Sequence, residues 1–137
     1  TPAIIFLNTN QSGNLEFNAE IQSDNEIEFT SESKGASYKK MLCMAFDIAL
    51  LVAYSSKSFY RFAYHDGSLE GLDNRKKINY IDEVRKICKR DDLQYIFTAI
   101  EDDIPKLADG KLYINKNEIA VTLDDTGIEG KLFKMNF

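Results

Sequence analysis

The sequence contains little cysteine and little histidine, and this excludes several kinds of metal and disulfide protein. Its 137 residues include two cysteines and one histidine. Cys43 and Cys88 have no CxxC spacing and no histidine-rich neighbourhood, so a structural zinc site is excluded. We expect both cysteines to be reduced, buried thiols.

The sequence also lacks a membrane span and an excess of basic residues. Its most apolar stretch, residues 41–54, is too short to cross a bilayer and contains Asp47. The net charge is −5, and the basic groups at residues 39–40 and 75–77 fit solvated helix faces. Without a membrane span, we expect a cytoplasmic protein that has no membrane contact. Because affinity for nucleic acid comes mainly from clustered Lys and Arg, we also expect the chain to meet DNA only through other parts of a full-length protein.

The length and the hydrophobic content suit one folded domain over residues 1–137. Hydrophobic residues make up 44% of the chain, enough for a real core. The chain begins Thr1-Pro2-Ala3 without an initiator methionine. We therefore expect further sequence upstream.

The first part of the chain has the pattern of an antiparallel hairpin. Apolar residues alternate along residues 15–21 and resume at Ile27 and Phe29, after turn-forming residues at 23–25. Alternation of this kind predicts two strands with one buried face.

The second part has the pattern of alternating helices and strands. Residues 38–54 predict a helix that is apolar almost all round, in which Asp47 is either turned outward or paired. Residues 59–64 predict a central strand buried on both faces. Asp73 is positioned to cap a helix that runs to about residue 90, and residues 93–100 predict the next strand. With a short helix after Pro105 and a strand at residues 118–123, this order predicts a parallel α/β sheet.

Acidic residues follow two of the expected strands. Asp66 comes after the first strand, and Glu101, Asp102 and Asp103 come after the next. In parallel sheets ligands bind beyond the carboxyl ends of the strands, and one or two carboxylates there are enough to hold Mg²⁺. The alternative is that these acids cap the elements that follow them.

Three short motifs carry a resemblance to a known family. The segment Phe62-Ala63-Tyr64-His65-Asp66, followed by Leu72-Asp73, resembles the Walker B motif and D-loop of ABC ATPases. The upstream segment Ser33-Lys34-Gly35-Ala36 resembles the degenerate signature motif of the SMC and RecN group. The resemblance covers about residues 15–105, and within the group the chain is most similar to a bacterial domain of unknown function at the C-terminus of SMC-like coiled-coil ATPases.

The resemblance implies a fold, a site and partners. The fold would be the C-lobe of a P-loop NTPase head of the ABC type, and the cofactors would be Mg²⁺ and ATP. Ser33 and Gly35 would contact the γ-phosphate held by an opposing head, Asp66 would hold the water shell of Mg²⁺, and Asp73 would act across the dimer. The partners would be the protein's own N-terminal Walker A lobe, joined through a coiled coil, and a second head in a homodimer acting in DNA repair or phage defence.

The chain also departs from the family pattern. Gly67 stands where the pattern has the catalytic glutamate, and Ile100-Glu101-Asp102 stands where it has the switch histidine. Glu70 and Glu101 are the candidates for a replacement base. The chain also lacks GxxxxGK[ST], the loop that binds phosphates, so we expect half of an ATPase at most and an inactive fragment by itself.

Two readings from other functional classes stay open. The first is a stand-alone Mg²⁺-dependent hydrolase or nuclease that uses five acidic residues, namely Asp66, Glu70, Asp73, Glu101 and Asp102. The second is a non-catalytic interaction module. His65, the single histidine, fits either a partner of Asp66 or a buried structural role.

Overall fold

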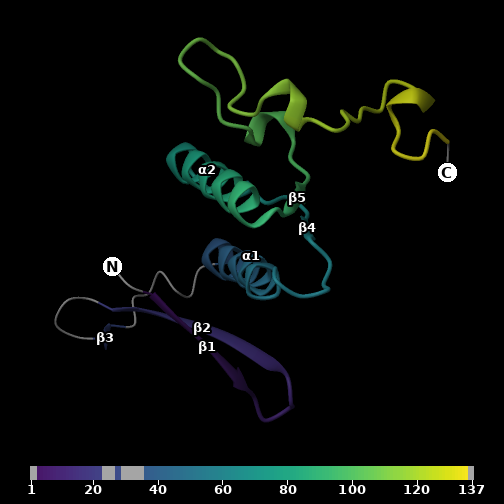
Figure 1. Cartoon of the computed structure of the whole chain (residues 1–137). Coiled ribbons are helices and arrows are strands. Elements are labelled where there is room, and N and C mark those ends of the chain that lie inside the picture. Colours follow the sequence, from purple (N-terminus) through teal and green to yellow (C-terminus); the bar gives the residue numbers. More distant parts are fainter. Residues whose placement is uncertain (1–2, 23–26, 29–35, 136–137) are drawn as a thin grey trace. The chain divides into compact units, whose positions relative to one another are not determined.

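The computed structural model describes residues 3–22, 27–28 and 36–135, and the chain divides into two compact units, Thr1–Asp103 and Ile104–Phe137. The first unit begins with a three-stranded antiparallel sheet (Figure 1). Its strands, in the order β1-β2-β3, are β1 (Ala3–Thr9), β2 (Leu15–Gln22) and β3 (Ile27–Glu28). The predicted hairpin is therefore confirmed as β2 and β3, and β1 adds a strand in front of it.

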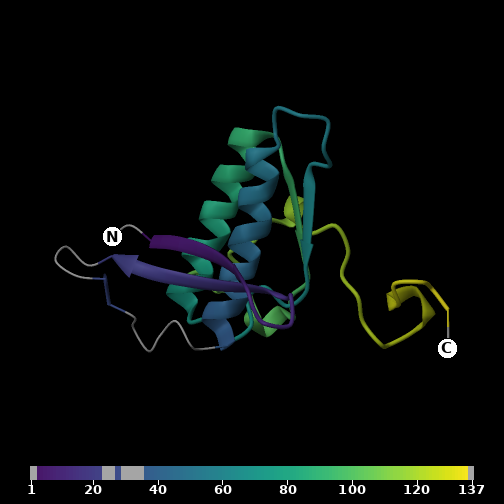
Figure 2. The ribbon, with the colours of Figure 1, turned by 90° about the horizontal axis from the view of Figure 1, so that it is seen from below.

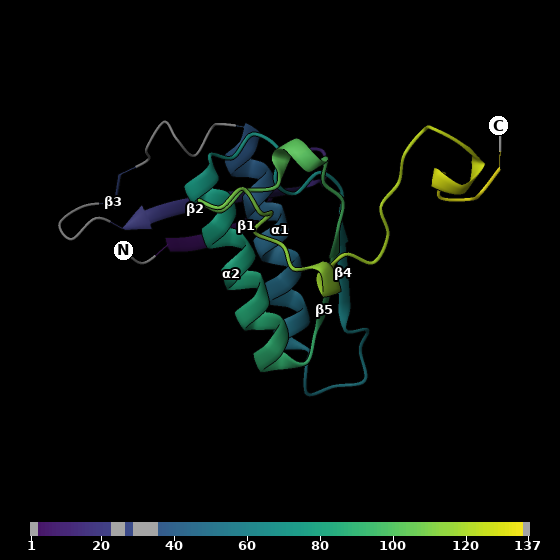
Figure 3. The same cartoon turned by 90° about the horizontal axis from the view of Figure 1, so that it is seen from above.

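Two helices and two parallel strands form the rest of the first unit. These elements are α1 (Ala36–Ala53), β4 (Phe62–His65), α2 (Asn74–Asp91) and β5 (Gln94–Phe97). The strands pair in parallel from Phe62 opposite Gln94 to His65 opposite Phe97. Figure 2 and Figure 3 both show the two helices side by side, with β4 and β5 running together along them. A small mixed α/β fold with a parallel strand pair is thus confirmed.

Helix α2 begins and ends where its sequence signals lie. The carboxylate of Asp73 accepts a hydrogen bond of 2.9 Å from the backbone N–H of Lys76, which satisfies one of the free amides of the first turn. At the other end, Asp92 adopts a left-handed conformation with φ of 54°, and its N–H bonds to the carbonyl of Cys88. The predicted cap at Asp73 is confirmed.

The core of this unit lies between the helices and the inner face of the strand pair. Its most buried apolar side chains come from α1, α2 and the loop after β4, and they are Met44, Leu51, Leu69, Ile81 and Val84. Complete burial of one side chain of this size adds about 1.5–3 kcal/mol to the free energy of unfolding. The loop after β4 is therefore part of the core, because it inserts the fully buried Leu69.

Two predictions about burial were wrong. The strand at β4 is not covered on both faces, because Phe62 and Tyr64 are 50% and 55% exposed while their neighbours Ala63 and His65 face the helices. The reason is that the described sheet has two strands and its helices cover one face. Cys43, expected to be a buried thiol, is exposed on α1, and both cysteines are free.

The second unit is built from turns. A bridge joins Lys106 to Leu112, and two 3-10 turns follow, η3 (Lys116–Glu118) and η4 (Ile128–Gly130). The helix predicted after Pro105 is not formed; a 3-10 turn, η2 (Glu101–Asp103), ends the first unit instead. The strand predicted at residues 118–123 also has no ladder partner among the described residues, and Val121 is 60% exposed.

No helix in the described part of the chain has the length and apolarity needed to cross a bilayer.

Candidate functional site

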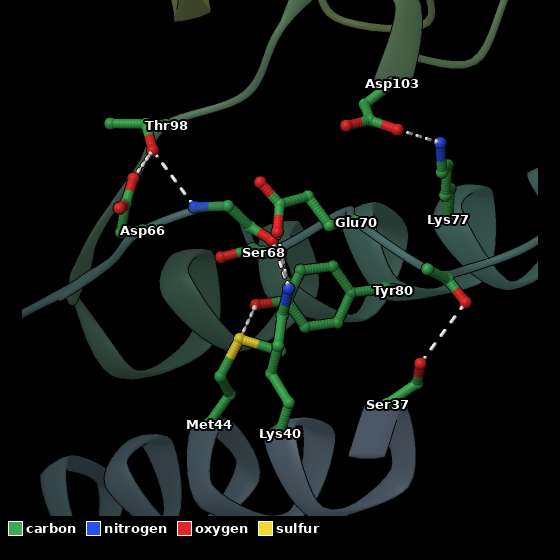
Figure 4. Close-up of polar contacts among 12 residues, drawn as sticks. Ser37, Lys40, Met44, Asp66, Ser68, Glu70, Lys77, Tyr80, Thr98 and Asp103 are labelled. Atoms are coloured by element: carbon green, nitrogen blue, oxygen red, sulfur yellow. Dashed lines mark hydrogen bonds and ion pairs between the residues drawn. The ribbon is translucent and has the colours of Figure 1, made fainter. Parts of the chain in front are cut away.

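Asp66 lies at the carboxyl end of β4, beside Thr98 at the carboxyl end of β5. The ladder continues past the strands, because the Thr98 N–H donates to the His65 carbonyl at 3.2 Å. The Thr98 hydroxyl donates a short hydrogen bond to Asp66 Oδ1 and accepts one of 3.0 Å from the backbone N–H of Gly67 (Figure 4). One carboxylate oxygen of Asp66 is thereby fixed, and Oδ2 has no hydrogen-bond partner among the described residues.

The turn after Asp66 depends on two glycines. Gly67 and Gly71 have φ of +58° and +74°, in the left-handed region that glycine adopts without steric cost. Between them, Ser68 and Leu69 are fully buried, and the N–H of Glu70 bonds to the carbonyl of Gly67 at 3.1 Å. The turn is therefore a tight segment that is anchored in the core at its centre.

Helix α1 holds this turn from the other side. The Lys40 ammonium donates a short hydrogen bond to the Gly67 carbonyl and lies 3.7 Å from Glu70 Oε2. The Ser37 hydroxyl lies 3.5 Å from the Gly71 carbonyl, to which it donates. Figure 4 shows both side chains reaching from α1 toward the turn. Ser33 and Gly35, the two predicted phosphate contacts, come just before α1 in the sequence and lie outside the described residues.

Asp73 serves as the cap of α2. Besides the amide bond described above, its Oδ2 lies 3.4 Å from the ammonium of Lys76. The hydrogen bond from the Lys76 backbone, helped by the charge of that side chain, lowers the pKa of the Asp73 carboxyl. Its carboxylate is 53% exposed and remains accessible from solvent.

The acidic run after β5 is divided between two roles. Asp103 forms an ion pair of 2.9 Å with Lys77, whose side chain is buried on α2. Glu101 and Asp102 are exposed in η2. Within the described residues, no group of three or more His, Cys, Asp or Glu side chains is close enough to hold a metal ion. The structure therefore does not gather Asp66, Asp73 and Glu101 into one acidic cluster.

His65 takes part in a partly buried polar network instead of contacting Asp66. Its Nε2 lies 2.9 Å from Asp47 Oδ2, and its Nδ1 lies 2.7 Å from the Tyr95 hydroxyl. The Tyr95 hydroxyl is also bonded to the Tyr80 hydroxyl, and it lies 3.2 Å from the Ser68 hydroxyl. Burial raises the pKa of both phenols. This explains Asp47, the one acid of an apolar helix, as a partner of His65.

Sequence reasoning missed Thr98 and Lys40. Thr98 could have been found from the parallel register, because the residue after β5 lies beside the residue after β4. Lys40 carries no such signal, since its contact with the Gly67 carbonyl depends on how α1 packs against the turn.

The comparisons with known proteins identify a family and no close relative of known role. No curated protein and no solved structure matches the chain significantly. A family described as "Uncharacterised protein conserved in bacteria (DUF2326)" matches residues 1–137. Because this match spans the whole sequence, the chain belongs to the bacterial family DUF2326.

Proposed function

We propose that this chain is the C-terminal lobe of an SMC/RecN-like ABC ATPase head, which contributes Asp66 and Asp73 to a nucleotide site shared between subunits. The observation that carries the proposal is the position of Asp66. Its carboxylate ends a strand of a parallel pair, has one oxygen fixed by Thr98 and keeps the other oxygen available. Ligands of parallel α/β sheets bind at this edge.

The chemistry of this position fits Mg²⁺. The ion is held in phosphate-handling enzymes through one or two carboxylates and keeps several of its waters, so it does not require a full protein cage. Asp66 would hold it through Oδ2, directly or through a water. When bound, Mg²⁺ supplies positive charge to the phosphates of a nucleotide.

The exposed face of the strand pair supports the need for a second lobe. Phe62, Tyr64 and Ile96 are 50%, 55% and 41% exposed on the face turned away from the helices. An open groove of about 260 Å³ runs beside β4 and is lined in part by Asp47 and Tyr60. Contiguous exposed apolar residues of this kind mark an interaction surface, and a Walker A lobe would cover it.

The same surface is what favours the second candidate, a non-catalytic interaction module. The third candidate, a stand-alone Mg²⁺-dependent hydrolase, receives less support. It would combine Asp66 with Glu70, Asp73, Glu101 and Asp102, whereas no three acidic side chains of the described residues lie close enough to share an ion, and Asp73 caps α2. Among these candidates, the shared ATPase site uses the available acid, Asp66, without requiring a cluster.

The test is ATP-dependent dimerisation of the full-length protein, measured by sedimentation with and without a non-hydrolysable ATP analogue. We expect the analogue to drive dimer formation in the wild type, and we expect Ser33→Arg to block it, because a large side chain would stand against the γ-phosphate of the opposing head. Asp66→Asn should abolish Mg²⁺-dependent ATP turnover with little change in volume. The exposed Lys57→Arg is the matched control and should behave like the wild type.

Two outcomes would contradict the proposal. One is a full-length sequence without a GxxxxGK[ST] motif and a coiled coil. The other is micromolar affinity of residues 1–137 alone for Mg-ATP, since most phosphate contacts should come from the Walker A lobe.

A further inference from the structure

We propose that the free edge of β4 is a docking site for an extended, basic segment of a partner protein, which adds a strand beside β4 and places a Lys or Arg side chain against Asp47. The inference goes beyond the proposed function and does not depend on nucleotide binding. The Walker A lobe of that proposal would lie on the exposed side chains of β4 and β5, whereas this segment would bond to the backbone of β4.

One edge of β4 carries backbone groups without a partner. Among the described residues β4 pairs with β5 alone, and the carbonyls of Arg61 and His65 accept hydrogen bonds of 2.8 and 3.2 Å from that side. In a parallel ladder every second residue of a strand bonds to a given neighbour, so Ala63 also bonds to β5. The N–H and C=O groups of Phe62 and Tyr64 point to the opposite edge, where no described residue meets them.

A groove follows this edge. The open groove of about 260 Å³ beside β4 is lined by the consecutive residues 62–65 and, from α1, by Asp47, Leu50 and Leu51. Side chains of consecutive residues point to opposite faces of a sheet. A groove that touches all four residues therefore lies along the edge of the strand, beside the unpaired backbone groups.

The usual devices that protect a sheet edge are missing here. Such edges are guarded by proline, by lysine or by a bulge, and residues 59–65 contain neither proline nor lysine. Their one basic side chain, Arg61, donates hydrogen bonds to the carbonyls of Ser55 and Asp91. Because β4 is four residues long, a docked strand gains few backbone bonds. Contacts to side chains must therefore add to its affinity.

The side chains of the groove suit a cation. Asp47 is 52% exposed; its Oδ2 pairs with His65, and its Oδ1 has no hydrogen-bond partner among the described residues. The rings of Tyr60, Phe62 and Tyr64 also line the groove and are 56%, 50% and 55% exposed. The face of an aromatic ring attracts a cation within about 6 Å. No described Lys or Arg lines the groove, so an incoming basic side chain meets a carboxylate and aromatic rings.

The charge of the chain disfavours a second copy as the occupant. The net charge is −5, and the exposed, strand-like residues 118–123 are followed by Asp124 and Asp125, which would bring like charge to Asp47. A small organic cation would satisfy Asp47 and leave the backbone groups unpaired. An extended segment with a Lys or Arg side chain satisfies both, by the strand addition that other peptide-binding sheets use.

The experiment measures the binding of labelled synthetic peptides to the 137-residue chain by fluorescence anisotropy. The probe is a capped peptide of alternating valine and threonine with one central arginine. One matched peptide has glutamate in place of the arginine, and another has N-methyl groups on alternate amides, so that it cannot pair as a strand. Asp47→Asn is compared with Asp82→Asn, because Asp82 is a carboxylate of α2 that also has a partner, Arg85 at 3.3 Å, and lies outside the groove.

Hydrogen exchange locates the bound peptide. In the free chain the amides of Ala63 and His65 should exchange slowly, because they bond to β5, and the amides of Phe62 and Tyr64 should exchange fast. Saturation with the arginine peptide should protect Phe62 and Tyr64. This readout uses the wild-type chain and is independent of how well any variant folds.

We expect the arginine peptide to bind about tenfold more tightly than either matched peptide. Asp47→Asn should remove most of the preference for arginine over glutamate, and Asp82→Asn should keep it. No binding of the arginine peptide, equal binding of the three peptides, or exchange at Phe62 and Tyr64 that stays fast would overturn the proposal.

Two further outcomes would assign the groove to another occupant and overturn the proposal as well. Arginine amide that binds as tightly as the whole peptide would show a site for a small cation. A chain that dimerises in sedimentation, with Phe62 and Tyr64 protected in the absence of peptide, would show that a second copy covers the edge. None of these measurements involves ATP, so their failure leaves the proposed function standing.

Discussion

The hydroxyl of Tyr95 and Nδ1 of His65 are 2.7 Å apart and join the two parallel strands through their side chains. Asp47, the third residue of this hydrogen-bond network, indicates which ring nitrogen of His65 donates. Because an ionised Asp47 carboxylate can only accept, His65 Nε2 donates to it across 2.9 Å, and in the neutral imidazole Nδ1 then accepts from the Tyr95 hydroxyl. The strand pair is thus fixed by a polar chain that ends on α1.

Removing the Tyr95 hydroxyl should destabilise the first unit. The variant Tyr95→Phe deletes the central member of the network and leaves His65 Nδ1 and the buried Ser68 hydroxyl without this partner. We expect the free energy of unfolding to fall by about 1–3 kcal/mol, as measured by urea denaturation. The control Tyr64→Phe changes an exposed phenol and should have almost no effect; equal losses in the two variants would contradict a role for the network.

Stability should fall at alkaline pH because of the buried phenols. Burial is the main cause that raises the pKa of Tyr80, well above the ordinary tyrosine value of about 10. The unfolded chain then loses this proton at a lower pH than the folded chain. The stabilisation is complete below pH of about 10 and is lost as pH rises toward the folded-state pKa.

The measurement is the difference in the free energy of unfolding between wild type and Tyr80→Phe, followed from neutral pH to above about pH 10. Groups that both proteins share cancel in this difference. The advantage of the wild type should therefore shrink as pH rises. Parallel curves for the two proteins would show that Tyr80 keeps an ordinary pKa.

The helices could be predicted from the sequence because their signals are local. Asp73 lies one residue before α2 and caps it, and the apolar spacing that follows is independent of distant parts of the chain. Asp66 was likewise recognisable, since it directly follows an apolar strand. These features are set by residues within one or two turns of each other.

The burial of the strands and the partners at the site depend on distant residues. The aromatic run at β4 has the composition of a central strand, yet Phe62 and Tyr64 are half exposed because the described sheet has two strands and one covered face. Residues 118–123 alternate as a strand does, and they lack a ladder partner in the part of the chain that the structure describes. Lys40 reaches Gly67 over 27 positions of sequence, a contact that no local pattern encodes.

The ion pair between Lys77 and Asp103 should contribute to stability mainly through the cost of leaving either partner alone. Lys77 is 6% exposed, and its ammonium lies 2.9 Å from Asp103 Oδ1. We expect Lys77→Met to lower the free energy of unfolding by about 3 kcal/mol, because it leaves a poorly hydrated carboxylate. The double variant Lys77→Met with Asp103→Leu should recover most of this loss.

An exposed pair provides the control for this prediction. Lys86 and Glu83 are 2.6 Å apart, closer than the buried pair, but their side chains are 70% and 62% exposed. Lys86→Met should change the free energy of unfolding by less than about 1 kcal/mol. A loss as large as that of Lys77→Met would mean that distance, and not burial, determines the contribution of these pairs.

The last prediction separates two effects of a side chain at Gly67. In Gly67→Ala the new Cβ meets a positive φ of +58° and the carboxylate of Glu70 at 2.6 Å. Gly13 has a similar φ of +80° with no atom within 4 Å of its virtual Cβ, so Gly13→Ala measures the cost of the backbone alone. Each variant should lose about 1–2 kcal/mol in urea denaturation, because the end of the Glu70 side chain can swing away at little cost. The two losses should therefore be similar. A much larger loss in Gly67→Ala than in Gly13→Ala would show that the Glu70 carboxylate, which is paired with Lys40, cannot move aside.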